Sequence, residues 1–68
     1  MINASEAGAK YTKNSFKSFL EGEQDEKWVM GVIGASNSED ITKALESLSV
    51  YSNNERFEVL KRLCGKSQ

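Results

Sequence analysis

The sequence predicts an all-α fold, a small bundle of three to four short helices in which residues 1–68 form a single domain. Apolar residues recur at helical spacing along most of the chain, and helix-starting and helix-stopping residues separate the apolar segments. No stretch outside residues 27–33 reads convincingly as a strand. A core in a chain of 68 residues rarely contributes more than about 3 to 5 kcal/mol of stability. Association with a second copy or with another protein is therefore an expected source of further stability.

The first helix is expected over residues 5–21. Lys10, Lys13 and Lys17 form a stripe, called the lysine stripe, whose alkyl stems can cover the edge of the core while the ammonium groups stay in water. Gly22 is expected to end the helix, because glycine is preferred just beyond a helix C-terminus. The apolar face lies within a sector of about 100° on a helical wheel and consists of Ala9, Phe16, Phe19 and Leu20.

Residues 27–33 allow two interpretations. Their large apolar residues have helical spacing, and the acidic residues just before them suit a helix N-terminus. Valine, isoleucine and glycine are weak helix formers, however, and a short continuous apolar run can also be a buried strand. A helix is favoured, because a strand needs a pairing partner that the rest of the chain does not offer. An α+β fold with residues 27–33 as a strand is the alternative.

Two more amphipathic helices are expected at residues 39–51 and 53–64. We expect them to form a hairpin that packs against Phe16, Phe19 and Leu20 of the first helix. Their apolar faces consist of Ile41, Ala44, Leu45 and Leu48 in one helix and of Phe57, Leu60, Leu63 and Cys64 in the other.

Serines are the predicted N-caps of both helices. Ser36 with Glu39 fits a capping box at the first start, and Ser38 is the alternative cap. Ser52 with Glu55 fits a capping box at the second start.

The composition disfavours enzymatic chemistry. The chain has no histidine, the residue that most often performs acid–base catalysis at neutral pH. Its one cysteine excludes an internal disulfide and leaves too few soft ligands for structural zinc. The acidic residues between positions 21 and 26 do not follow the spacing of a calcium loop. We therefore expect no enzymatic activity, no catalytic residue, no cofactor, no metal and no small-molecule substrate.

Cys64 is expected to be a core residue rather than a nucleophile. It belongs to an apolar helix face, and the negative end of a helix dipole disfavours a thiolate. A lone cysteine also fits a reducing compartment. The longest apolar run, residues 28–35, is far shorter than the roughly 20 residues that cross a bilayer. We expect a cytoplasmic protein with no membrane partner.

A helix-turn-helix DNA-binding module is the alternative function. Residues 28–51 have roughly the lengths of two helices joined by a short turn. The second of these helices carries Glu39, Asp40 and Glu46 where base edges and phosphates would lie. The net charge of −1 supplies no general attraction to nucleic acid, and only the lysine stripe could contact phosphates. A nucleic-acid partner is therefore disfavoured.

Several large apolar residues fall outside the main helix faces. Tyr11, Met30 and Val50 lie off the apolar stripes, and Trp28 lies at the edge of a short one. A small bundle can wrap such residues into its own core, but aromatic residues and methionine are also favoured at interfaces. We expect Trp28 and Met30 to anchor a partner, with Tyr11 as a further anchor and the lysine stripe as a rim that selects an acidic partner. The expected function is non-enzymatic binding of a protein partner or self-association into a homo-oligomer.

The opening residues resemble those of small phage and prophage proteins, in which Met-Ile-x-Ala-x-Glu-Ala leads into a helix. The resemblance covers residues 1–7 and carries no site. It implies a bacterial cytoplasm and an accessory role directed at the host, such as a regulator or inhibitor of a host protein. The matching residues are Met1, Ile2, Ala4, Glu6 and Ala7.

Overall fold

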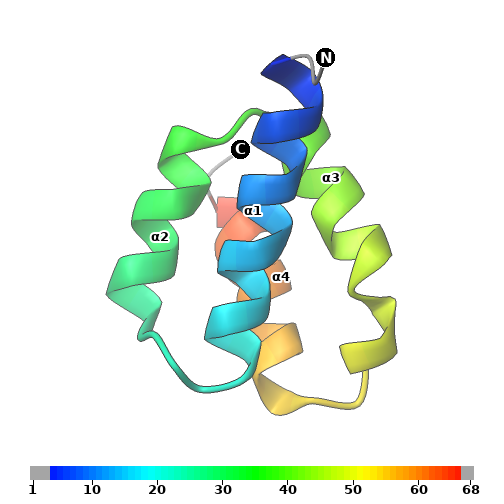
Figure 1. Cartoon of the computed structure of the whole chain (residues 1–68). Coiled ribbons are helices and arrows are strands. Elements are labelled where there is room, and N and C mark those ends of the chain that lie inside the picture. Colours follow the sequence, from blue (N-terminus) through cyan, green and yellow to red (C-terminus); the bar gives the residue numbers. More distant parts are fainter. Residues whose placement is uncertain (1–3, 67–68) are drawn as a thin grey trace.

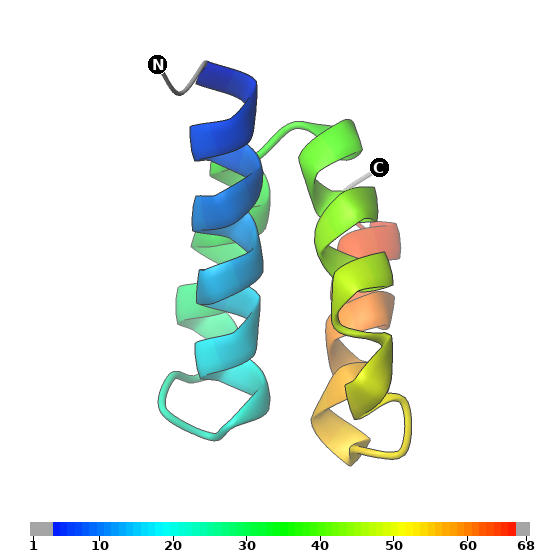
Figure 2. The same cartoon turned by 45° about the vertical axis from the view of Figure 1, so that its right-hand side comes forward.

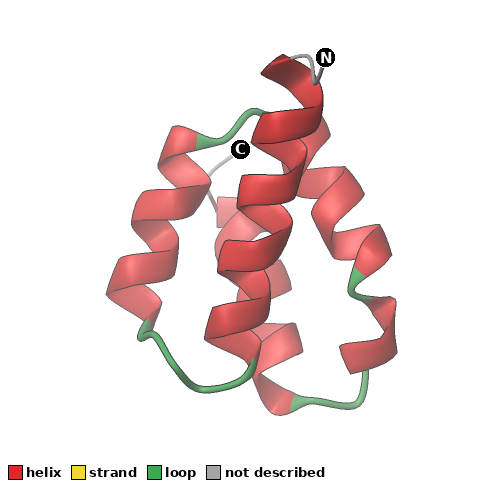
Figure 3. Ribbon diagram, viewed as in Figure 1, coloured by secondary structure: helices red, strands yellow, loops and turns green. Residues whose placement is uncertain are grey.

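The computed structural model describes residues 4–66, with side chains from residue 8 onward, and shows only helices in this range. No strand occurs in these residues, so the all-α prediction is confirmed and the strand alternative for residues 27–33 is wrong (Figure 3). Residues 1–3, which carry part of the resemblance to phage proteins, lie outside the described residues. The helices are α1 (Ala4–Leu20), α2 (Glu26–Ala35), α3 (Ser38–Ser47), the short 3₁₀ helix η1 (Ser49–Tyr51) and α4 (Glu55–Lys66).

Consecutive α-helices run in opposite directions. In Figure 1, α1 lies in front, α2 and α3 lie on either side of it, and α4 lies behind. Figure 2, turned by 45°, shows α1 on one side of the molecule and α3 on the other, with the α1–α2 loop and the loop before α4 at the same end. Helix α1 contacts each of the other three α-helices and so holds the bundle together.

The core lies between all four α-helices and contains most of the residues that the helical spacing predicted. Ala9 is the exception, because it is only half-buried and does not belong to the core. Phe16 on α1 and Leu60 on α4 have no exposed surface, and Phe19 and Cys64 are also buried. Leu45 is half-buried against this core. The remaining core residues are Leu20, Val29, Val32, Ile33, Ile41, Ala44, Leu48, Phe57 and Leu63.

The most extensive contact between helices joins α1 and α3, which run in the same direction. Small residues on both helices allow the close approach, among them Gly8 on α1 and Ala44 on α3. A Cβ atom at Gly8 would lie only 2.8 Å from Oδ2 of Asp40, so a larger residue at this position would displace the Asp40 carboxylate. The expected hairpin of α3 and α4 is therefore not the closest helix pair.

Gly22 ends α1, as predicted. Its φ of 81° is in the left-handed region that glycine adopts without strain. The N–H of Gly22 donates to the carbonyl of Phe19 (3.0 Å), and the N–H of Glu23 donates to the carbonyl of Ser18 (2.9 Å). This pair of bonds is a Schellman motif, which satisfies carbonyls that the helix leaves without a partner.

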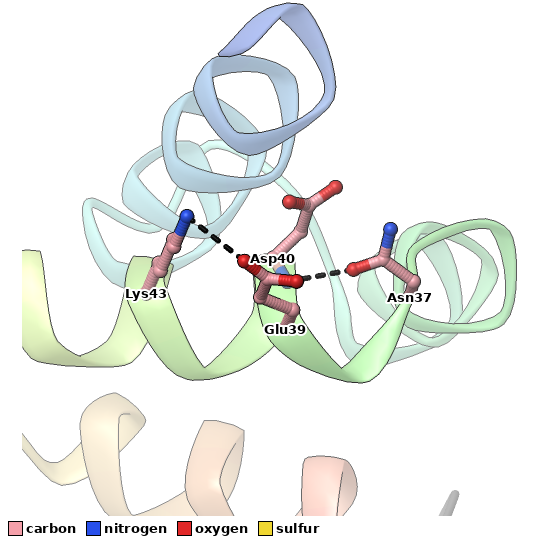
Figure 4. A network of polar contacts seen from close by, with 4 residues as sticks. All are labelled: Asn37, Glu39, Asp40 and Lys43. Atoms are coloured by element: carbon pink, nitrogen blue, oxygen red, sulfur yellow. Dashed lines mark hydrogen bonds and ion pairs between the residues drawn. The ribbon is translucent and has the colours of Figure 1, made fainter. Parts of the chain in front are cut away.

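The predicted serine cap of α3 is wrong. Asn37 caps the helix, and its side-chain oxygen accepts the backbone N–H of Asp40 at 2.8 Å (Figure 4). Ser36 instead joins two helices, because its Oγ lies 2.8 Å from Oγ1 of Thr12 on α1 and 2.8 Å from the carbonyl of Val32. Ser38 is the first residue of the helix itself.

Helix α4 also begins differently from the prediction. Asn54, rather than Ser52, lies just before the helix, and its side-chain oxygen accepts the N–H of Arg56 at 2.8 Å. Its side-chain nitrogen donates to the carbonyl of Leu20 at 3.2 Å. An asparagine can make both bonds because its amide carries the acceptor oxygen and the donor nitrogen on separate atoms.

Candidate protein-binding surface

Beyond its first two residues, Glu26 and Lys27, helix α2 is apolar on every side but is covered by the bundle on only one. Val29, Val32 and Ile33 are buried in the core. No charged side chain occurs between Lys27 and Ser36, so the exposed side of the helix is apolar as well. A helix that is apolar all round is normally covered on all sides. We call the exposed side the α2 outer face, and it consists of Trp28, Met30, Gly31, Gly34 and Ala35.

Trp28 and Met30 lie on either side of two glycines. Successive residues are about 100° apart around a helix, which places Gly31 and Gly34 between Trp28 and Met30 on the outside of α2. A Cβ atom at either glycine would meet no other atom within 4 Å. The exposed fractions of Trp28 and Met30 are 37% and 51%. A partner can therefore approach the α2 backbone closely between Trp28 and Met30, two large apolar side chains that are only partly covered by their own chain.

The N-terminus of α2 is held by Asp25. One carboxylate oxygen of Asp25 accepts the backbone N–H of Trp28 at 2.8 Å. This cap orients the first turn and with it the start of the outer face. Glu23, Asp25 and Glu26 are exposed and outnumber the exposed Lys27, so the border of the outer face at this end of α2 has a net negative charge.

Tyr11 is 54% exposed but does not adjoin Trp28. Its neighbour Thr12 contacts Ser36, which directly follows α2. Trp28 precedes Ser36 by eight residues, or about 12 Å along the axis at 1.5 Å per residue. Tyr11 therefore lies near the C-terminal end of α2, whereas Trp28 lies at the N-terminal end.

The lysine stripe does not border Trp28 and Met30. Lys10 and Lys13 line a groove of about 380 Å³ between α1 and α3, and exposed Lys17 continues the row one turn further along α1. Helices α2 and α3 flank α1 on opposite sides (Figure 1), so this groove and the α2 outer face are separate surfaces. We call it the α1–α3 groove, and its lining residues are Ala9, Lys10, Lys13, Lys43, Ala44 and Ser47.

A further depression, of about 490 Å³, is lined by residues 22–26 and Arg56. The guanidinium of Arg56 donates to the carbonyl of Phe19 (2.5 Å) and to that of Gln24 (2.6 Å). It also lies 4.3 Å from the centroid of the Phe19 ring. Arg56 is thus engaged in joining the start of α4 to the end of α1, and we assign it a structural role.

Two parts of these surfaces were not among the predicted binding residues. The glycines of α2 could have been recognised from the absence of charge between Lys27 and Ser36. Lys43 was expected only as the i, i+4 partner of Glu39, and that ion pair is confirmed at 3.1 Å (Figure 4). Its place in the α1–α3 groove depends on how α1 and α3 pack, which has no local signal in the sequence.

Cys64 is expected to react slowly with electrophiles. Burial raises the pKa of its thiol from 9.0 to about 11. The thiolate is the reactive form, so at about pH 8 its fraction should be about 100-fold lower than in a thiol with a pKa of about 9. Mass spectrometry of iodoacetamide labelling should show the native chain reacting at least this much more slowly than the chain unfolded in urea. Equal rates would mean that Cys64 is exposed in solution.

The same thiol makes stability depend on pH on the alkaline side. The raised pKa means that the folded state favours the protonated thiol, so this contribution is complete below about pH 9 and is lost as the pH rises towards 11.

Among the side chains that the structure describes, from residue 8 to residue 66, no three cysteine or carboxylate groups gather at a position that could hold a metal ion. None of the helices in this range combines the length and the apolar character needed to cross a bilayer. Comparison of the chain with protein-family models, with curated proteins and with solved structures finds no match.

Proposed function

We propose that this chain is a non-enzymatic protein of the cytoplasm that binds another protein through the α2 outer face. The observation that carries the proposal is the exposure of Trp28 and Met30 on either side of an open helix surface that has no charged residue after Lys27. Tryptophan and methionine are favoured at interfaces, and the central glycines allow a partner to reach the backbone. The Trp28 and Met30 side chains are already partly packed against their own chain, so binding a partner costs little additional side-chain entropy.

The charge around the α2 outer face favours a foreign protein over a second copy. The border at the start of α2 is acidic, and residues 36–38 at its other end are uncharged. Two copies paired through parallel α2 helices would bring their acidic borders together, and antiparallel pairing would give these borders no basic counterpart on the partner's residues 36–38. A partner that carries basic residues beside an apolar ridge is complementary in both respects. Self-association is the alternative.

The resemblance of residues 1–7 to phage proteins extends this proposal. A chain of phage origin that lacks catalytic groups would act in the bacterial cytoplasm by occupying a surface of a host protein. A regulator or inhibitor of that protein is the role that this origin supports.

Replacing Trp28 with aspartate should abolish partner binding, because the substitution removes the apolar anchor and adds charge to the surface that must be desolvated. The experiment immobilises the wild-type chain, the Trp28→Asp variant and the Met30→Asp variant and captures proteins from a bacterial lysate. We expect a protein that the wild type retains and both variants lose. Purified partner should then shift the fluorescence of Trp28, the single tryptophan of the chain, to shorter wavelength.

The matched control is Val50→Asp, which also converts an exposed apolar residue to aspartate, at a position on η1 rather than α2. Val50 is 84% exposed, and this variant should bind the partner like the wild type. Light scattering separates the alternatives. A mass that rises with protein concentration, together with the fluorescence shift, would show that the α2 outer face binds a second copy rather than a foreign protein. A strict monomer with no Trp28-dependent partner would contradict both.

A further inference from the structure

The α1–α3 groove brings together lysines that are far apart in the sequence. Lys10 and Lys13 come from α1, and Lys43 comes from α3. In Figure 4 the Lys43 side chain extends from α3 towards the side on which α1 lies. Ala9 and Ala44 are more buried than the lysines and give the groove an apolar lining, which we call the alanine floor, and the exposed Ser47 also lines the groove. The groove therefore combines positive charge with a small apolar base.

The positive charge of the groove is only partly neutralised by the protein itself. Lys43 pairs with Glu39, and this hydrogen bond raises the pKa of the Lys43 ammonium. Among the side chains that the structure describes, Lys10 and Lys13 form no ion pair, and neither does Lys17 beyond the groove. Their ammonium groups are thus available to an external anion.

We propose that the α1–α3 groove binds an acidic segment of another protein. Its carboxylates pair with Lys10 and Lys13, while a small apolar side chain rests on the alanine floor. The proposal goes beyond the function assigned to the α2 outer face, because it concerns a different surface and a partner of opposite charge. A chain with both surfaces can contact two proteins or two parts of one.

Peptide carboxylates fit this groove better than nucleic acid. Glu39 and Asp40 lie at the start of α3, near Lys43, where they would repel a polyanion that extends past the groove. The few free lysines can neutralise only a few phosphates, whereas duplex DNA carries a negative charge about every 1.7 Å along its axis. The alanine floor supplies an apolar contact that a phosphate backbone does not use.

The test is fluorescence anisotropy with a labelled peptide of alternating glutamate and alanine. We expect binding at about 10 mM salt that weakens at about 100 mM, because the Debye length falls from about 30 to about 10 Å between them. A peptide of alternating lysine and alanine should not bind. Two charge reversals, Lys10→Glu with Lys13→Glu, should lower the affinity for the acidic peptide by about tenfold or more.

Two further variants separate the groove from general electrostatic attraction. Lys27→Glu with Lys66→Glu makes the same change in net charge on α2 and α4 and should leave peptide binding nearly unchanged. Ser47→Leu fills the edge of the groove without changing charge and should weaken binding. Circular dichroism of each variant confirms that it is folded. Trp28→Asp should bind the peptide like the wild type, which separates this proposal from the function of the α2 outer face.

Four results would overturn the proposal. The first is that the acidic peptide does not bind at low salt, and the second is that both charge-reversal pairs lose the same affinity for it. The third is that Ser47→Leu binds the peptide as tightly as the wild type. The fourth is that labelled duplex DNA binds more tightly than the peptide and that this binding depends on Lys10 and Lys13. Self-association that the Lys10 and Lys13 reversals abolish would also overturn it, in favour of the acidic α1–α2 loop of a second copy as the occupant.

Discussion

Phe16→Ala should leave most of the protein unfolded at 25 °C. Phe16 has no exposed surface and lies in the core that all four α-helices share. Truncating a buried phenylalanine to alanine costs about 3 to 5 kcal/mol, because apolar contacts are lost and a cavity is left. A core of this size supplies roughly the same amount in total. Far-UV circular dichroism should therefore show a large loss of helix in the variant.

The control for this experiment is Val50→Ala, an apolar truncation at a residue that is 84% exposed. Its free energy of unfolding in urea should lie within about 0.5 kcal/mol of the wild type. A Phe16→Ala variant that unfolds cooperatively and has lost only about 1 kcal/mol would show that the core can collapse around the cavity, contrary to the tight packing around Phe16.

Arg56→Ala should lower the free energy of unfolding by about 2 kcal/mol. Arg56 makes two charge-assisted hydrogen bonds to the carbonyls of Phe19 and Gln24, and its guanidinium also lies over the Phe19 ring. Bonds to charged groups contribute about 1.5 to 3 kcal/mol each when buried, and partial exposure of this site reduces that value. The loss should appear as a lower midpoint in urea unfolding with an unchanged slope.

Two variants test whether the geometry of the guanidinium matters. Arg56→Lys keeps the charge but cannot offer two N–H groups in a fixed fork, so it should recover less than half of the lost stability. Arg62→Ala removes an exposed arginine from the same helix and should be nearly neutral. If Arg56→Ala is as stable as Arg62→Ala, the contacts between Arg56 and the end of α1 do not stabilise the fold.

The helices and their buried faces were largely predictable because both depend on local spacing. Phe16, Leu60 and Cys64 were assigned to the core from periodicity alone, and each is buried. Gly22 was assigned to the end of α1 from its identity, and its positive φ agrees. The caps were less predictable, since serine, asparagine and aspartate compete for the same position. Asn37 caps α3 in place of Ser36, whose hydroxyl instead forms a hydrogen bond with Thr12 on α1.

The residues of the candidate surfaces could be picked out from the sequence, but their positions relative to one another could not. Tyr11, Trp28 and Met30 were assigned to a binding surface, with burial in the core as the alternative, and each is exposed. Their relation to the lysine stripe was not predictable, because it depends on the order of the helices around α1. Lys10 and Lys13 face α3, while Trp28 and Met30 lie on α2.

The amino-acid sequence by itself determined where this chain is helical, which side of each helix is buried, and that α2 has no charged residue after Lys27. These properties depend on residues within four positions of one another. Only the tertiary structure decided that α1 pairs most closely with α3, that Arg56 joins α4 to the end of α1, and that the lysines and the α2 outer face form separate surfaces. Such pairings depend on side-chain volumes at positions far apart in the chain, as at Gly8 and Asp40, where a side chain on Gly8 would displace the Asp40 carboxylate.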